Sequence, residues 1–278
     1  MFIDCHTHAF ADKIADRAVE QLINYYHIDT SFGGRLADLI AAANAARLDA
    51  LVMLVAATKP EQLKPANDWI LTIAGLSKAQ LEAKLQMPVY PRLIPFGTFH
   101  PEAPEWEKEI ARLRSAGIKG IKLHPEFQQI DLAAPELLPF WEEVRRDFII
   151  MIHVGDPVVS ADNYSTPRKI ASLLDKFPGI RIIAAHLGGY NFWDEVLQVL
   201  AGKEVYLDTS SSLPYIDPAL LRQIVSKHGT DRLLFGSDYP LQSPAQEREM
   251  FEAKMHWLTS REKDRILGDN CAALLEIA

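Results

Sequence analysis

The feature that most constrains the fold is a series of short apolar runs, each about as long as one β-strand and each followed by a segment with helical spacing. Every residue of the run 50–55 is apolar. Continuous apolar runs are typical of strands covered by helices on both faces, whereas alternating runs are typical of strands with one face in water. The pattern therefore predicts an α/β protein with a parallel sheet and helices outside it.

Eight such runs occur along the chain, and we expect each to form a strand. They cover residues 2–8, 50–55, 89–99, 118–123, 148–154, 180–185, 205–208 and 233–238. Helical spacing lies between them, most clearly in 11–26, 61–85, 166–177 and 193–200. Eight strand–helix units in 278 residues match the size of a (β/α)8 TIM barrel. An open doubly wound sheet fits the alternation nearly as well.

Composition indicates one globular domain, which we expect to span residues 1–278, because no repeat, low-complexity segment or linker divides the chain. The net charge of −8 and the lack of a basic run argue against a nucleic-acid partner. No apolar run approaches the length of a membrane span. Two cysteines form no disulfide framework, and no signal peptide is recognisable, so we expect a cytoplasmic protein without a membrane partner.

The first strand ends in the sequence Asp4-Cys5-His6-Thr7-His8. On a strand, residues i and i+2 point to the same side, so the two histidines project together. Two imidazoles one pleat apart suit a single divalent metal ion. Taken alone, the motif is equally compatible with two unrelated structural histidines.

Polar residues gather at the ends of the predicted strands. Six of the nine histidines lie there, and so do two aspartates: His6, His8, His100, His124, His153, His186, Asp208 and Asp238. In a barrel, the carboxyl ends of all strands meet at one mouth, where barrel active sites lie, whereas an open sheet would spread them along an edge. This distribution favours both the barrel and a metal site.

Several motifs, taken in order, resemble the amidohydrolase superfamily. The resemblance covers essentially the whole chain and is greatest to the amidohydrolase 2 branch, which contains hydrolases, decarboxylases related to aminocarboxymuconate-semialdehyde decarboxylase, and some hydratases and lactonases. It implies the distorted barrel of the metallo-dependent hydrolases. The motifs that carry it are Asp4-Cys-His-Thr-His8, Gly120-Ile-Lys-Leu-His-Pro125, Ile152-His153, Ala185-His-Leu-Gly-Gly189 and Leu234-Phe-Gly-Ser-Asp-Tyr-Pro240.

The resemblance implies a role for each matching residue. His6, His8 and His153 would bind a metal ion together with Asp238, which would also take a proton from water. His186 would act as an acid/base or bind a second metal. Three imidazoles and one carboxylate suit Zn²⁺, and Mn²⁺ or Fe²⁺ could replace it. We therefore expect one or two divalent ions.

Four further residues are expected near the mouth. In some relatives a lysine on the fourth strand is carboxylated and bridges two metals, which makes Lys122 a candidate for a second metal or for substrate. The alternative, which we favour, is an uncarboxylated lysine paired with a carboxylate of Asp208 or of the substrate. His100, His124 and Asp208 are candidates for substrate binding, although His124 could equally cap the turn that follows it.

These observations lead to a functional hypothesis with two rivals. The favoured function is a metal-dependent hydrolase acting on an amide, lactone or ester of a small polar molecule. A metal-dependent non-oxidative decarboxylase would use the same ligands, but decarboxylases of this branch tend to carry an insertion after the first strand, and the crossover here, residues 10–49, is modest. A non-catalytic metal-binding barrel fits poorly, because Asp238 and His186 are both present.

Two further expectations concern the substrate and the oligomeric state. Substrate specificity should lie in the loops after the strands, which include Tyr164, Asn191, Phe192 and Tyr215. A homodimer is expected only by analogy with the family.

Overall fold

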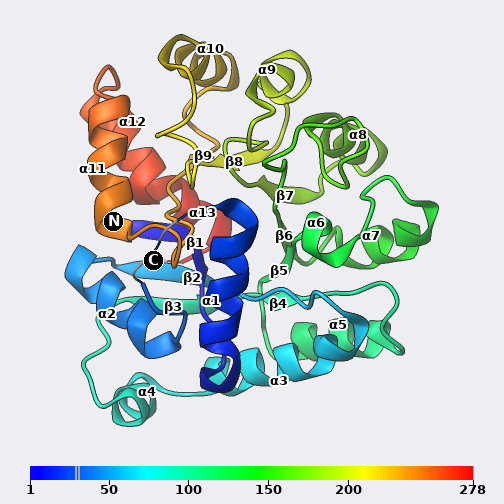
Figure 1. Ribbon diagram of the computed structural model, residues 1–278, viewed down its shortest axis with the longest axis vertical. Coiled ribbons are helices and arrows are strands. Elements are labelled where there is room, and N and C mark those ends of the chain that lie inside the picture. The colour runs from blue at the N-terminus through cyan, green and yellow to red at the C-terminus, as the bar shows by residue number, and fades with distance from the viewer. Residues whose placement is uncertain (29, 31, 278) are drawn as a thin grey trace.

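The computed structural model describes residues 1–28, 30 and 32–277. Helices form a ring around a central set of strands, and helix α1 (Asp12–Tyr26) lies across that set on the side that faces the viewer in Figure 1. Among the described residues, no helix is both long enough and apolar enough to cross a membrane.

The strands are all paired in parallel and follow one another in chain order. Hydrogen bonds group them into a three-stranded sheet, β1-β2-β3, and a six-stranded sheet, β4 to β9. Their bounds are β1 (Ile3–His8), β2 (Ala50–Leu54), β3 (Arg92–Pro95), β4 (Gly97–Thr98), β5 (Gly120–Leu123), β6 (Ile149–Ile152), β7 (Arg181–Ala184), β8 (Tyr206–Asp208) and β9 (Leu233–Leu234).

The two sheets are parts of one barrel. Only Phe96 separates β3 from β4, so both lie along one strand path. At the other junction, the amide of Cys5 donates to the carbonyl of Phe235 at 2.9 Å, and the amide of Asp238 donates to the carbonyl of His6 at 2.8 Å. The last strand segment therefore returns to β1, and the predicted (β/α)8 barrel is confirmed.

Helices follow the strands at most crossovers and are the outer layer of the barrel. Their bounds are α2 (Leu36–Ala46), α3 (Leu63–Ala74), α4 (Lys78–Leu85), α5 (Trp106–Ser115), α6 (Pro125–Gln128), α7 (Leu138–Val144), α8 (Pro167–Lys176), α9 (Trp193–Glu195), α10 (Pro218–His228), α11 (Pro244–Lys254), α12 (Ser260–Asp264) and α13 (Asn270–Leu275).

Some boundaries differ from the sequence-based expectations. The expected strand 89–99 is divided at Phe96, and the expected strand 233–238 is regular only over Leu233–Leu234. The helical segment 61–85 contains two helices, because the Ser77 hydroxyl accepts a hydrogen bond from the amide of Gln80 and so begins α4. Capping by a side chain thus divides a stretch whose apolar spacing is continuous.

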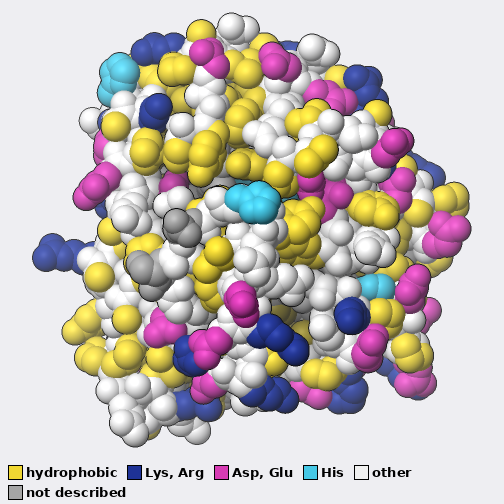
Figure 2. All heavy atoms as spheres, viewed as in Figure 1, with side chains coloured by type: hydrophobic (Ala, Val, Ile, Leu, Met, Phe, Trp, Pro, Cys, Tyr) yellow, Lys and Arg dark blue, Asp and Glu magenta, His cyan; other side chains and the backbone are white. Residues whose placement is uncertain are grey.

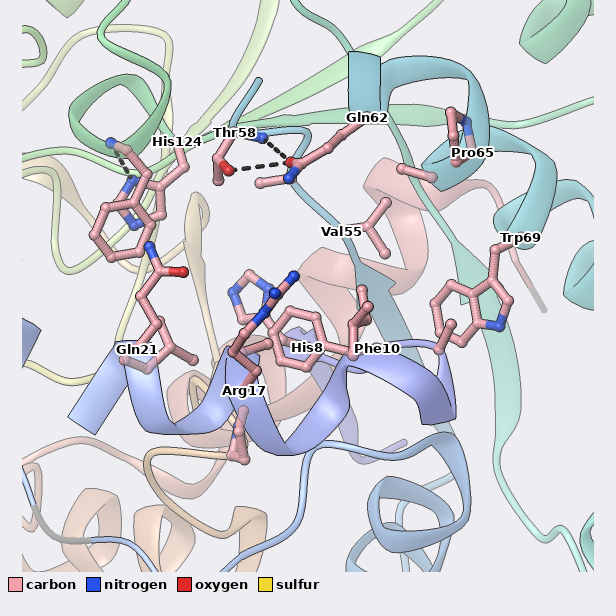
Figure 3. A pocket seen from close by; sticks show the side chains of 18 of the residues that line it. His8, Phe10, Arg17, Gln21, Val55, Thr58, Gln62, Pro65, Trp69 and His124 are labelled. Carbon is pink, nitrogen blue, oxygen red and sulfur yellow. Dashed lines mark hydrogen bonds between the residues drawn. The ribbon is translucent and has the colours of Figure 1, made fainter. Parts of the chain in front are cut away.

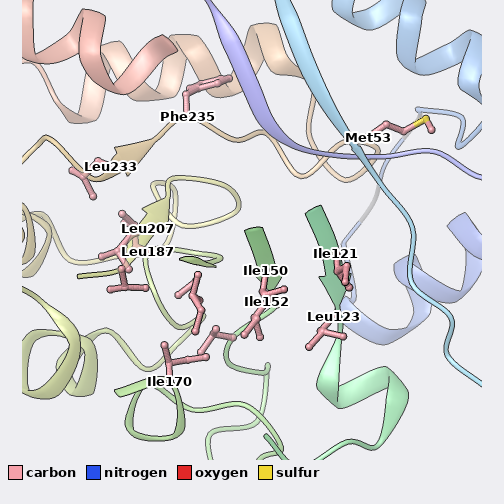
Figure 4. Packing of buried hydrophobic residues seen from close by; sticks show 14 of the residues in the cluster. Met53, Ile121, Leu123, Ile150, Ile152, Ile170, Leu187, Leu207, Leu233 and Phe235 are labelled. Atoms are coloured by element: carbon pink, nitrogen blue, oxygen red, sulfur yellow. The ribbon is translucent and has the colours of Figure 1, made fainter. Parts of the chain in front are cut away.

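Buried apolar residues form one layer inside the barrel and another between strands and helices. On β6, Ile149 and Met151 belong to one cluster of buried residues, whereas Ile150 and Ile152 belong to the other. Figure 4 shows the second pair beside side chains of neighbouring strands and of Ile170 on α8. Because successive strand residues point to opposite faces, both faces of β6 are covered, as its continuous apolar run predicts.

Candidate metal centre and active site

Three ligand atoms converge where β1 meets the segment that follows β9. The Nε2 atoms of His6 and His8 lie 3.2 Å apart. The Asp238 Oδ1 atom lies 3.4 Å from the first of them and 3.6 Å from the second. Two residues at period two on one strand and a carboxylate from the neighbouring segment thus form a compact cluster, which we call the metal centre. The structure thus brings His6 and His8 together, as expected from their spacing on the strand.

Asp208, at the end of β8, orients the His6 ring. Its Oδ2 atom lies 3.0 Å from His6 Nδ1, and both side chains are buried. A carboxylate accepts hydrogen bonds, so Nδ1 carries the proton and Nε2 presents a lone pair to the metal centre. The other oxygen, Oδ1, accepts from the backbone amides of His186 (3.2 Å) and Ser210 (3.0 Å), which fixes the carboxylate.

Burial controls the charge of the metal centre. It holds the pKa values of His6 and His8 well below their usual range, so both imidazoles are neutral and can act as ligands. It also raises the pKa of Asp238 to about 7. Burial lowers the pKa of Lys122 to about 8. The site therefore holds groups whose protonation changes near neutral pH, as catalytic sites do.

Lys122, on β5, is fully buried and faces His6. Its Nζ atom lies 3.1 Å from His6 Nε2. Among the residues that the structure describes, Lys122 forms no ion pair with Asp208, so of the two partners that we favoured from the sequence only the carboxylate of a substrate stays a prediction. The lysine instead lies at the edge of the metal centre, where its role as a second-metal ligand stays a prediction.

His153 and His186 form a second row beside the metal centre. His153 Nδ1 lies 2.9 Å from His186 Nε2, and His186 Nδ1 lies 3.1 Å from the carbonyl oxygen of Ser210. The centroids of the His6 and His186 rings are 5.2 Å apart. His186 and Asp238 both have positive φ (61° and 63°), which is uncommon outside glycine and often found at functional sites.

His124 and His100 differ in their relation to the site. The His124 ring stacks on that of His153, with centroids 3.9 Å apart, and its Nδ1 accepts a hydrogen bond from the amide of Phe127 at the start of α6. It therefore both faces the site and caps the turn. His100 accepts a hydrogen bond from the amide of Glu102 in its own loop and does not line the cavity described below.

Two residues of α1 were missed at the level of sequence. The Tyr26 hydroxyl lies 3.0 Å from His124 Nε2 and 3.4 Å from His153 Nε2. The Tyr25 hydroxyl donates to a carboxylate oxygen of Asp156 in the loop after β6. Both tyrosines end an apolar helical stripe, which the sequence indicates as ordinary packing, so no signal distinguished them.

A cavity of about 500 Å³ lies between α1 and the mouth of the barrel. His8, His153 and Asp238 form part of its wall, and side chains of α1 and α3 form much of the rest, as Figure 3 shows. The loop residues expected to set specificity do not line this cavity: Tyr164, Asn191, Phe192 and Tyr215. The lining of this cavity comes mainly from the first two crossovers, and the role of the four loop residues in specificity stays a prediction.

The donor set of the metal centre fits a divalent cation. Two neutral imidazole nitrogens and one carboxylate oxygen face one another, and the proton of His6 is directed away to Asp208. Such a set, with a carboxylate behind a ligating histidine, is typical of metal sites in proteins. A cluster of this kind at the carboxyl ends of the strands lies where active sites occur in parallel α/β barrels.

Comparison with known proteins identifies the family. The amidohydrolase family model matches residues 3–277, and the chain therefore belongs to the amidohydrolase family. On the face shown in Figure 2, acidic and basic side chains are interspersed.

Solved structures with the same fold are distant in sequence. An uncharacterized TIM-barrel protein from Bordetella bronchiseptica is 18% identical, with a TM-score of 0.76 over 99% of this chain and 98% of its own. A candidate 2-pyrone-4,6-dicarboxylic acid hydrolase from Pseudomonas putida is 19% identical (TM-score 0.65; 99% and 97%). A dihydroxybenzoic acid decarboxylase from Polaromonas sp. JS666, with bound manganese and the inhibitor 2-nitroresorcinol, is 15% identical (TM-score 0.63; 99% and 96%).

Proposed function

We propose that the protein is a metal-dependent hydrolase that opens an amide, lactone or ester bond of a small molecule. One observation carries this proposal: two neutral imidazole nitrogens and a carboxylate oxygen lie within 3.2–3.6 Å of one another beside a cavity of about 500 Å³. A cavity of this size holds a small organic molecule.

The metal would be held by His6, His8 and Asp238, with His153 as the fourth protein ligand implied by the family resemblance. When bound, a divalent ion supplies Lewis-acid polarisation and lowers the pKa of water toward about 7. Zn²⁺ is our first choice because imidazole suits it, and Mn²⁺ is the main alternative because one structural neighbour contains manganese.

Asp238 and His186 are the proposed proton-transfer groups. The carboxylate of Asp238 faces the cavity, where it can accept a proton from an attacking water. His186 does not line the cavity, but its Nε2 contacts Nδ1 of His153, which does. His186 is thus the proposed acid/base, held beside the cavity wall by this contact.

A non-oxidative decarboxylase is the second candidate. It is favoured by the neighbour described as a dihydroxybenzoic acid decarboxylase, which has the same fold. In this reaction His186 would deliver a proton to the carbon atom from which CO₂ leaves. The ligands are the same for both reactions, so the modest first crossover (10–49) is what favours hydrolysis.

The first test is the metal content of protein purified without added metal, beside the His6→Ala variant. We expect about one Zn or Mn per chain by elemental analysis and little in the variant, whereas His256→Ala, which changes an exposed histidine, should keep the wild-type content. Two ions per chain would assign Lys122 and His186 as further ligands. No metal in the wild type, even after Zn²⁺ is added, would contradict the proposal.

The second test separates the reactions. Wild-type protein is assayed against lactones, esters and amides by acid release, and against aromatic acids by CO₂ release. We expect turnover in the first set, and expect Asp238→Asn to abolish it while the fold and most metal binding remain. Turnover only in the second set would assign the decarboxylase.

A further inference from the structure

Helix α1 carries its charges on two different faces. Asp12, Asp16 and Glu20 follow one another at a spacing of four residues and do not line the cavity. Lys13 and Arg17 have the same spacing one position further along, and both line it. Residues four apart lie on one face of a helix, so the helix turns its cations toward the cavity.

The two cations are unpaired where the structure describes their surroundings. Neither side chain forms an ion pair or a hydrogen bond with another described residue, whereas Asp16, on the acidic face, pairs with Arg35 at 2.7 Å. In Figure 3 the Arg17 side chain extends from α1 into the space that faces Thr58 and Gln62. These two cations are the only charged residues that α1 contributes to the cavity lining, although the net charge of the chain is −8.

Gln62 adds a second hydrogen-bond donor across the cavity. Its Oε1 atom accepts from the Thr58 amide at 2.8 Å and from the Thr58 hydroxyl at 3.0 Å. A backbone amide can only donate, so the oxygen of the Gln62 side chain must face Thr58. Its NH₂ group is then left to donate to a ligand.

The remaining wall beyond the metal centre is mainly apolar. It includes Ile14, Val55 and Trp69, and Ile14 is 40% exposed although it lies on the inner face of α1. The one carboxylate of the lining other than Asp238 is that of Glu61. The cavity thus offers apolar contact together with donors at Arg17 and Gln62.

We infer that the substrate is an apolar acid whose carboxylate, separate from the bond that reacts, is bound by Arg17 with help from Gln62. The guanidinium group matches a carboxylate with two parallel hydrogen bonds, and Lys13 adds positive charge. This inference rests on the proposed function, because it assigns the substrate class of the same site. Arg17 is therefore a specificity-determining residue contributed by the first crossover helix.

Binding of small probes tests the inference without a known substrate. Isothermal titration calorimetry at pH 7.5 compares 3-phenylpropionate with its neutral amide, and hexanoate with hexanamide, on the protein as purified. We expect at least one acid to bind about tenfold more tightly than its amide, which corresponds to about 1.4 kcal/mol. In Arg17→Met the ratio of the affinity for the acid to that for the amide should fall to near one. Arg146→Met, which removes the same charge from an exposed position, should keep it.

Three results would overturn the inference: no preference for acid in the wild type, no detectable binding of any probe, or a preference that survives in Arg17→Met.

The His6→Ala variant separates failure of this inference from failure of the proposed function. If the acid preference persists in His6→Ala and disappears in Arg17→Met, Arg17 binds the acid, whatever the metal content. If it disappears in His6→Ala and survives in Arg17→Met, the metal centre binds the acid and the inference is wrong.

Discussion

Asp208 shows how much of this site depends on one hydrogen bond. From the sequence it was a candidate substrate contact, because it ends a strand. The structure instead places its Oδ2 atom 3.0 Å from His6 Nδ1, so it acts through the histidine. Position at a strand end was predictable; the direction of the carboxylate was not, since it depends on contact between residues 202 positions apart.

We predict that Asp208→Asn lowers metal affinity about 10–100-fold while the fold is kept. The amide can donate to Nδ1, which would favour the tautomer with a proton on Nε2, where the metal binds. Competition with a chromophoric chelator at pH 7.5 measures the affinity, and circular dichroism checks the fold. Asp217→Asn, at the exposed N-cap of α10, is the matched control. Equal affinity in Asp208→Asn and wild type would refute this role.

Glu247 on α11 gives a prediction about stability. Its side chain is buried, its Oε2 atom has no hydrogen-bond partner among the described residues, and burial raises its pKa from 4.5 to about 8. The folded protein therefore holds a proton that the unfolded chain releases above pH 4.5. Stability from this group is present at low pH and is lost as the pH rises from about 4.5 to about 8.

Glu247→Gln should remove this pH dependence. We expect the variant to match the wild type at pH 5 and to exceed its free energy of unfolding by about 2–4 kcal/mol at pH 8, measured by urea denaturation. Glu249→Gln, an exposed neighbour on the same helix, should show no such gain. A variant less stable than wild type at pH 8 would mean that Glu247 is ionised and paired in the folded state.

At the scale of elements, α1 is the part of the structure that sequence patterns describe least well. Its helical spacing is clear, yet only Ala15 of its fifteen residues is buried. The stripe that should pack on a core faces the cavity instead. Periodicity predicts that a helix has an apolar face, but it does not show whether that face packs on the protein core or lines a ligand cavity.

Because α1 buries so little, we expect its docking to depend on the hydrogen bond between Tyr25 and Asp156. Tyr25→Phe should increase the rate of amide hydrogen exchange along α1 about 3- to 10-fold, because the free energy of local opening falls by about 1 kcal/mol. Global stability should change little. Mass spectrometry of deuterated peptides measures it. Tyr90→Phe, which changes a tyrosine that is 66% exposed, is the control. Unchanged exchange in α1 would show that other contacts hold the helix.

Strand positions were predicted better than strand lengths. The apolar runs located all the strand paths of the barrel, because both faces of each strand are buried. The run 89–99 gave no sign of the division at Phe96, whose ring fills the space where a Cβ atom of Gly120 would lie, 2.1 Å away. That close approach is a property of the packed barrel and cannot be seen in local sequence.

For the whole molecule, the expectation of a single domain leads to a thermodynamic prediction. The strands follow chain order around the barrel, and the first and last are joined, so no part can close the barrel alone. We expect far-UV circular dichroism and tryptophan fluorescence to give coincident unfolding curves, and added Zn²⁺ to shift both to higher temperature by the same amount. Two separated transitions would indicate independently folding parts.

The proposed metal ligands come from distant parts of the chain: the amide of Asp238 donates to the carbonyl of His6 across the junction that closes the barrel. During synthesis, a ribosome releases the first strand long before the partner that completes the ligand set. Until the segment that carries Asp238 has been made, the nascent chain lacks one of the proposed ligands, so we expect tight metal binding only after the final strand has arrived. Tight metal binding would then report that the barrel is complete.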